Sequence, residues 1–128
     1  MKFTDQVIAI TGAGRGIGCA AAKLFAQEGA VVVLLEIAGD EGREVAQAIA
    51  TAGGRSHFVR TDVADASSVA SAFAEIEHRF GRLDVLYNNA SIYLGQHDGP
   101  LGDVSWETWR RVLAVNLDGL FHCCQRAL

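Results

Sequence analysis

Residues 7–18 read VIAITGAGRGIG, and this stretch decides the fold. Its first four residues form a short apolar run that is typical of a buried strand, and a cluster of glycines follows at once. Residues 17–28 then carry apolar side chains at helical spacing, and Gly29 stands where a glycine commonly ends a helix. The stretch therefore predicts a strand, a tight turn and the start of a helix.

The rest of the chain repeats this alternation at intervals of about 25 to 30 residues, as βαβ units do. Further strands are predicted at 30–35, 56–61 and 83–87. Helices are predicted at 39–52, at 65–80 with Asp65 as the N-cap, and from Ser105 to the end of the chain. Residues 88–102 form a predicted loop that holds the only proline.

This alternation predicts an α/β protein with a Rossmann-type, doubly wound parallel sheet in which the strand order is 3-2-1-4. We expect residues 1–128 to form a single, incomplete dinucleotide-binding domain that stops before a fifth strand. In such a sheet the ligand lies beyond the carboxyl ends of the strands, where the winding reverses.

Composition excludes several classes of partner. Eleven Lys and Arg against fifteen Asp and Glu give a net charge of −4, which leaves no basic surface for nucleic acid or for an anionic membrane. No apolar run is long enough to span a bilayer or to direct export, so we expect a cytoplasmic protein. Three cysteines encode no disulfide framework, and no metal site is expected, since His122, Cys123 and Cys124 would point apart on a helix.

The glycine-rich turn predicts a phosphate site. Backbone N–H groups at the start of a helix, with the positive end of the helix dipole behind them, bind a pyrophosphate without a lysine. Glu36 at the end of the second strand could accept hydrogen bonds from an adenosine ribose. The alternatives are a plain glycine-rich turn and a solvated acidic residue, and the two signals together favour the dinucleotide.

With these motifs the sequence resembles the short-chain dehydrogenase/reductase family, whose Thr-Gly-x3-Gly-x-Gly pattern matches residues 11–18. The resemblance implies that Asp62 and Val63 contact the adenine, and that residues 88–90 (NNA) belong to the family's Asn-Asn-Ala-Gly motif, with Ser91 in place of glycine. Local turns bonded by the side chains are the alternative for Asp62 and the two asparagines. The implied cofactor-binding residues are Thr11, Gly12, Arg15, Gly16, Ile17, Gly18, Glu36, Asp62, Val63, Asn89 and Ala90.

Two residues bear on the choice of cofactor. A carboxylate at Glu36 would repel a 2′-phosphate and accept from a 2′-hydroxyl, which favours NAD. Arg15 resembles a feature of NADP-using relatives, where a basic residue meets the 2′-phosphate. We expect NAD, because placing a carboxylate against a phosphate costs more free energy than leaving an arginine without a partner.

The resemblance also implies catalytic residues, of which this chain carries one. Asn116 resembles the family's asparagine in the helix after the fourth strand, although it could instead bond a neighbouring backbone group. The family's Tyr-x3-Lys is absent, since neither Tyr87 nor Tyr93 has a lysine four positions later. The chain thus looks like the amino-terminal half of a longer enzyme and is expected to be inactive alone.

The predicted function is that of an NAD(P)-dependent oxidoreductase acting on a secondary alcohol or ketone, seen as its cofactor-binding half. By the resemblance, the full-length protein would be a homo-oligomer that uses the last helix, whose Trp109 and Phe121 could otherwise be buried against the chain's own sheet. One alternative is a nucleotide-binding or sensing module without catalysis. Another is an S-adenosylmethionine methyltransferase, although these usually carry a carboxylate where Ile10 and Thr11 stand.

Overall fold

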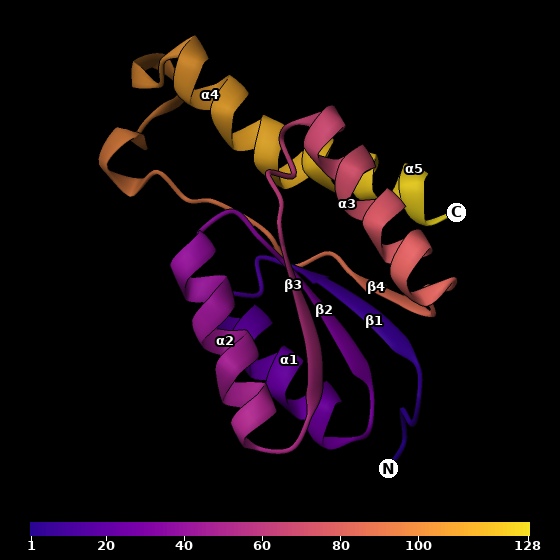
Figure 1. Cartoon of the computed structure of the whole chain (residues 1–128). Coiled ribbons are helices and arrows are strands. Elements are labelled where there is room, and N and C mark those ends of the chain that lie inside the picture. Colours follow the sequence, from indigo (N-terminus) through magenta and orange to yellow (C-terminus); the bar gives the residue numbers. More distant parts are fainter.

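The computed structural model describes residues 1–128 and contains one parallel sheet with helices on both faces (Figure 1). Its strands are β1 (Val7–Thr11), β2 (Val31–Glu36), β3 (Arg55–Arg60) and β4 (Val85–Tyr87). Its α-helices are α1 (Gly16–Gln27), α2 (Gly39–Thr51), α3 (Ala66–Phe80), α4 (Trp106–Leu113) and α5 (Gly119–Ala127).

The sheet has the order β3-β2-β1-β4, and every neighbouring pair is parallel. The prediction of a doubly wound α/β sheet with strand order 3-2-1-4 is therefore confirmed. All four strands were predicted to within one or two residues at each end: β1 ends at Thr11, one residue later than predicted, β2 is shifted one residue later, β3 one residue earlier, and β4 begins two residues later, at Val85. The winding reverses between β1 and β4, which places the expected crevice beyond the end of β1.

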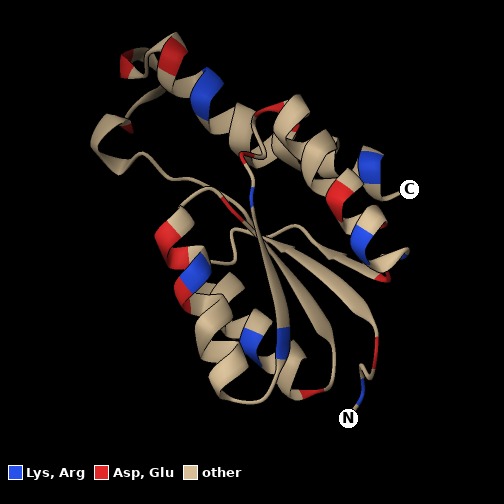
Figure 2. Cartoon of the chain, in the orientation of Figure 1, with Lys and Arg blue, Asp and Glu red and all other residues tan.

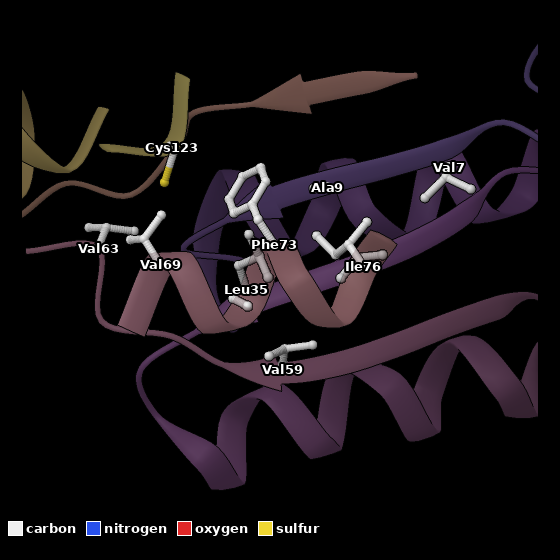
Figure 3. Close-up of a cluster of buried hydrophobic side chains, with 11 residues drawn as sticks. Val7, Ala9, Leu35, Val59, Val63, Val69, Phe73, Ile76 and Cys123 are labelled. Atoms are coloured by element: carbon white, nitrogen blue, oxygen red, sulfur yellow. The ribbon is translucent and has the colours of Figure 1, made fainter. Parts of the chain in front are cut away.

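Two hydrophobic clusters lie on opposite faces of the sheet, because successive side chains of a strand point to opposite sides. Ile8 and Ile10 of β1 are fully buried among side chains of α1 and α2. Ala9 and Leu35 belong to the other cluster, which Figure 3 shows together with Phe73 of α3. Burial of each large aliphatic side chain contributes about 1.5–3 kcal/mol, so β1 anchors both layers.

The ends of α3 match the sequence signals. Asp65 caps its start, where the carboxylate accepts a hydrogen bond from the backbone N–H of Ser67 at 2.9 Å. Gly81 caps its end with a φ of 65°, a left-handed conformation that glycine adopts without steric cost. These two caps fix the length of the helix that covers one face of the sheet.

The last helix differs from the prediction in two respects. The helix predicted from Ser105 to the end is interrupted by a π-helical turn at Ala114–Asp118, which separates α4 from α5. Trp109 and Phe121 are exposed at 46% and 58%, so the alternative that they are buried against the chain's own sheet is wrong. Of the three cysteines, only Cys123 is buried, and Cys19 and Cys124 are partly exposed.

Charged residues lie mainly on the helices and at the ends of the strands. Figure 2 shows acidic and basic residues interspersed over the helices and a sheet that is largely uncharged. None of the helices combines the length and the apolar character that crossing a bilayer requires.

Candidate functional site

A cavity of about 630 Å³ opens at the carboxyl ends of the strands. Its wall comes from the ends of the strands, from the loops that follow all four of them, and from the last helical segments. Several residues that the sequence analysis assigned to a dinucleotide site line it: Gly12, Arg15, Ile17, Glu36, Asp62, Val63, Asn89 and Ala90. Residues that are far apart in the sequence thus meet at one crevice, where the winding reverses.

The glycines of the turn after β1 are required for space and for backbone conformation. Gly12 has a φ of 64°, and a Cβ atom there would lie 2.9 Å from the Cα of Ala90. A Cβ on Gly18 would lie 2.3 Å from the carbonyl oxygen of Gly12, so the first turn of α1 packs directly on the loop. Gly16, with a φ of 56°, has no heavy atom within 4 Å of its Cβ position, which leaves open space above the turn.

The start of α1 presents free backbone donors to the cavity. Its N-cap residue, Arg15, makes no side-chain hydrogen bond to the helix, and the first turn contains no acidic residue. Backbone N–H groups in this turn therefore lack a side-chain acceptor, and the positive end of the helix dipole lies behind them. Both Arg15 and Ile17 line the cavity, which places this helix end at its wall.

Thr11 and Asn89 lie beneath the glycine turn and bond to one another's loops. The hydroxyl oxygen of the buried Thr11 accepts hydrogen bonds from the backbone N–H groups of Asn89 and Ala90, at 3.0 and 2.9 Å. In return, the amide Nδ2 of Asn89 donates to the carbonyl oxygens of Thr11 and Gly12, each at 3.1 Å. These four hydrogen bonds hold the loop after β4 against the loop after β1.

Glu36 lies at the end of β2 and is 7% exposed. Its Oε2 accepts a hydrogen bond from the backbone N–H of Gly14 at 2.8 Å, and its Oε1 accepts one from Ala38 N–H at 3.0 Å. A carboxylate offers about four acceptor positions, so lone pairs remain beyond these two bonds. Because Glu36 also lines the cavity, the remaining acceptor capacity lies beside the space that a ligand would fill.

Asp62 and Val63 follow β3 and line the same cavity. One carboxylate oxygen of Asp62, Oδ1, accepts a hydrogen bond from the backbone N–H of Ala64 at 3.0 Å, and the backbone N–H of Asp62 donates to the Ser68 hydroxyl at 3.0 Å. Asp62 thus makes the local turn that the alternative interpretation described, while it also lines the cavity. Val63 is buried beneath Gly119, and a Cβ atom on Gly119 would lie 2.7 Å from the Val63 side chain.

Asn116 lies in the π-helical turn and bonds to the loop after β4. Its Oδ1 accepts from the backbone N–H of Ile92 at 2.8 Å, and its Nδ2 donates to the Ile92 carbonyl oxygen at 3.0 Å. The side chain lines a second, smaller cavity of about 190 Å³, which is also walled by Thr11, Ser91 and Leu120. The amide therefore ties the last helical segment to the loop that borders both cavities.

Three residues at the site were not predicted from the sequence as part of a binding site. Gly14 donates to Glu36, Ser91 lines both cavities, and Arg111 of α4 lines the larger one. Neither Arg15 nor Arg111 makes an ion pair or a side-chain hydrogen bond within the chain, so both cations are available to an anion. Sequence spacing carried no signal for Arg111, because only the path of the loop at 88–102 brings α4 over the cavity.

Cys123 lies beside the site and is a poor nucleophile because its thiol is buried. Burial, and next the neighbouring Cys124, raise the pKa of the Cys123 thiol to about 11. The Sγ of Cys124 accepts a hydrogen bond from the Nδ2 of Asn88 at 3.3 Å. These contacts fasten α5 to the end of β4 and assign no chemistry to the thiols.

Comparison with known proteins identifies the type of site. The family model of the short chain dehydrogenases matches residues 6–128. Meso-2,3-butanediol dehydrogenase of Serratia marcescens is 39% identical over 128 residues, which are 100% of this chain and 49% of that protein. Cis-4-hydroxycyclohexanecarboxylate dehydrogenase of Sinomonas cyclohexanicum is 41% identical over 126 residues, 98% of this chain and 49% of that protein.

Solved structures agree with the sequence matches. A short-chain dehydrogenase/reductase from Serratia marcescens superposes with a TM-score of 0.92 at 34% identity, covering 99% of this chain and 51% of that one. The chain spans about half the length of the curated relatives it matches. Since the family match runs through the glycine turn, the end of β2 and the loop after β4, the chain belongs to the short-chain dehydrogenase family of oxidoreductases.

Proposed function

We propose that this chain is the cofactor-binding part of an NAD-dependent oxidoreductase that interconverts a secondary alcohol and a ketone. The observation that carries the proposal is the meeting of the glycine turn and Glu36 in one cavity of about 630 Å³. Two relatives are named as dehydrogenases of hydroxyl compounds, a butanediol and a hydroxycyclohexanecarboxylate, which supports an alcohol as the substrate class.

The residues present fit a dinucleotide. The open space above Gly16 and the uncapped first turn of α1 suit a pyrophosphate, which would accept hydrogen bonds from backbone N–H groups. The apolar wall at Val63, Ala90 and Val115 suits an adenine ring. When bound, the nicotinamide would supply or accept the hydride, and the protein would hold it in place.

Glu36 favours NAD over NADP in this proposal. Its buried carboxylate has acceptor capacity for ribose hydroxyls, and it would repel the two negative charges of a 2′-phosphate at close range. Arg15 is exposed, lines the same cavity and makes no bond within the chain, so it is the residue that would assist a 2′-phosphate. The carboxylate dominates because it is fixed by two hydrogen bonds, whereas an exposed arginine side chain is free to turn into solvent.

Asn116 has a supporting role in the proposed reaction. Its amide is engaged by both backbone groups of Ile92, so it acts by holding the loop that borders the reacting end of the cavity. We therefore describe Asn116 as a positioning residue for catalysis. Thr11 and Asn89 hold the glycine turn in the same way, from beneath.

Titration calorimetry with NAD⁺, NADP⁺ and S-adenosylmethionine tests the proposal. We expect the chain to bind NAD⁺ most tightly, NADP⁺ more weakly and S-adenosylmethionine not at all. Gly12→Val is expected to weaken NAD⁺ binding by more than about tenfold, because its side chain would collide with Ala90 and its φ of 64° disfavours a branched residue.

Gly99→Val is the matched control, since a Cβ at Gly99 meets no atom within 4 Å and its φ is not positive. This variant is expected to bind NAD⁺ like the unchanged chain. Tight binding of S-adenosylmethionine alone would contradict the proposal, as would equal NAD⁺ affinity in the Gly12→Val variant with a retained fold.

A further inference from the structure

The backbone at Gly14 does not by itself require glycine. Unlike Gly12 and Gly16, Gly14 does not have a positive φ, so its conformation is open to any residue. What excludes a side chain is Glu36: a Cβ atom on Gly14 would lie 2.8 Å from its Cγ, 2.9 Å from its Cδ and 2.9 Å from its Oε2. The three nearest atoms all belong to this one side chain.

Glu36 cannot yield to such a side chain without losing its own contacts. Its Oε2 accepts from the N–H of Gly14 at 2.8 Å and its Oε1 accepts from the N–H of Ala38 at 3.0 Å. The side chain is 7% exposed, so it lies in a closed position between the glycine turn and the end of β2. Rotation away from a Cβ at position 14 would break one or both bonds and move the carboxylate within the cavity.

We propose that Gly14 is a specificity-determining residue for the cofactor: by lacking a side chain it admits the Glu36 carboxylate, and the two residues select NAD as one unit. The inference rests on the proposed binding of a dinucleotide in this cavity. Beyond that binding, we infer that Glu36 selects a ribose without a 2′-phosphate only when position 14 is glycine.

The pair also couples two parts of the site that would bind different parts of the cofactor. Gly14 belongs to the turn that faces the pyrophosphate, and Glu36 is the acceptor for the ribose. Their hydrogen bond fixes the turn against β2 before any ligand arrives, which is a form of preorganisation. Displacement of the carboxylate should therefore lower NAD⁺ affinity and the ratio of NAD⁺ to NADP⁺ affinity, as loss of the carboxylate would.

A double-mutant cycle tests this coupling with the variants Gly14→Ala, Glu36→Ala and both together. Glu36→Ala removes all three atoms that a Cβ at position 14 would meet. We expect Gly14→Ala to weaken NAD⁺ binding by about tenfold or more and to weaken NADP⁺ binding less, so that the ratio of the two affinities falls. In the Glu36→Ala background the same substitution should change neither affinity by more than about twofold.

Thermal unfolding without ligand gives a second readout. Gly14→Ala should lower the melting temperature when Glu36 is present, and should leave it unchanged or raise it when residue 36 is alanine. Gly102→Ala is the matched control, because Gly102 has neither a positive φ nor an atom within 4 Å of its Cβ position. It should leave binding, selectivity and melting temperature unchanged in both backgrounds.

The coupling is refuted if Gly14→Ala retains the NAD⁺ affinity and the cofactor ratio of the unchanged chain. It is equally refuted if the losses are as large in the Glu36→Ala background as in the chain that keeps Glu36. Failure of the proposed function has a different signature, namely that the unchanged chain binds neither dinucleotide. In that case the melting temperatures still decide whether Gly14 and Glu36 act as one unit.

Discussion

Glu36 is the residue whose charge and position support the proposed preference for NAD. It receives two backbone N–H groups, from Gly14 and Ala38, and these bonds hold the carboxylate at the wall of the cavity. A carboxylate held in this way meets ribose hydroxyls without the entropy cost of ordering a mobile side chain. Its negative charge and its shape contribute separately to the proposed choice of cofactor, and an isosteric substitution can distinguish the two contributions.

Glu36→Gln is expected to reverse or abolish the preference for NAD. The amide carbonyl can still accept from Gly14, whereas the N–H of Ala38 loses its acceptor, and the repulsion of a 2′-phosphate disappears. We expect NADP⁺ affinity to rise by about tenfold and NAD⁺ affinity to fall less than in Glu36→Ala. Calorimetry with both cofactors measures this, and an unchanged NADP⁺ affinity would show that charge at position 36 does not govern the choice.

For individual residues, the sequence predicted which ones lie together at the site better than it predicted which atoms each side chain contacts. Gly12, Gly16 and Glu36 could be identified from local signals alone. The two glycines lie in the turn between a predicted strand and a predicted helix, and Glu36 lies at the end of the second predicted strand. Gly14 could not, because its partner lies at the end of the neighbouring strand β2, 22 residues away in the chain. Asn89 was predicted to contact the cofactor and lines the cavity, but the sequence did not reveal that its amide donates to the carbonyl oxygens of Thr11 and Gly12.

At the scale of elements, the π-helical turn at Ala114–Asp118 joins the last helices to the loop after β4 through Asn116. Asn116→Ala would remove both hydrogen bonds to Ile92 and leave that backbone unpaired. At about 0.5–1.5 kcal/mol for each neutral bond, we expect the free energy of unfolding to fall by about 1–3 kcal/mol. Urea denaturation measures the change.

Asn116→Asp is the companion variant. An aspartate keeps the acceptor for the Ile92 N–H but places a second acceptor against the Ile92 carbonyl oxygen, so it should not restore stability. If either variant unfolded at the same urea concentration as the unchanged chain, the proposed link between the turn and the loop would be wrong.

The start of β1 is fastened to the start of β4 by Asp84. Its carboxylate pairs with Arg82 and accepts from the backbone N–H of Val7 at 2.8 Å. The hydrogen bond from Arg82, followed by that from Val7, holds the pKa of Asp84 below its ordinary value of 3.8. In the unfolded chain the carboxyl group takes up its proton at higher pH, so the pair stabilises the fold above that ordinary value and loses this effect as pH falls through the folded pKa.

We therefore expect Asp84→Asn to lower the free energy of unfolding above about pH 5 and to have a diminishing effect in more acidic solution. The effect should be small, because the pair lies at the surface and is screened by salt. Asp103→Asn, at a side chain without an ion pair, is the control. A stability difference for Asp84→Asn that stays constant down to about pH 2 would contradict this account.

The strands and most helices could be predicted because their signals are local. β1 and β2 are continuous apolar runs, and α3 carries both of its caps in the sequence. The π-helical turn could not be predicted, since Ala114–Asp118 keeps the residue types of an ordinary helix.

For the molecule as a whole, the segment formed by α4, the π-helical turn and α5 carries several exposed apolar side chains, including Trp106, Trp109, Leu117, Leu120 and Phe121. Exposed apolar groups gathered on one segment of a small protein favour association. We expect the chain to self-associate with rising concentration in sedimentation velocity experiments. The substitution pair Leu117→Lys and Phe121→Lys should reduce this association without lowering the melting temperature.

Leu24→Lys is the control for that prediction. Leu24 is also exposed, at 62%, but lies on α1, on the opposite face of the sheet. It should leave association unchanged. A chain that stays monomeric at every concentration, or a lysine pair that associates as before, would show that this segment does not drive the contact.

The central claim is that the glycine turn and Glu36 together bind an adenine dinucleotide. Titration of NADH into the isotopically labelled chain, followed through its backbone amide resonances, tests this residue by residue. We expect saturable shifts at Gly12, Gly14, Gly16 and Glu36, with the backs of α1 and α3 unaffected. Saturable shifts confined to other surfaces, or no shifts at millimolar NADH in a folded chain, would contradict it.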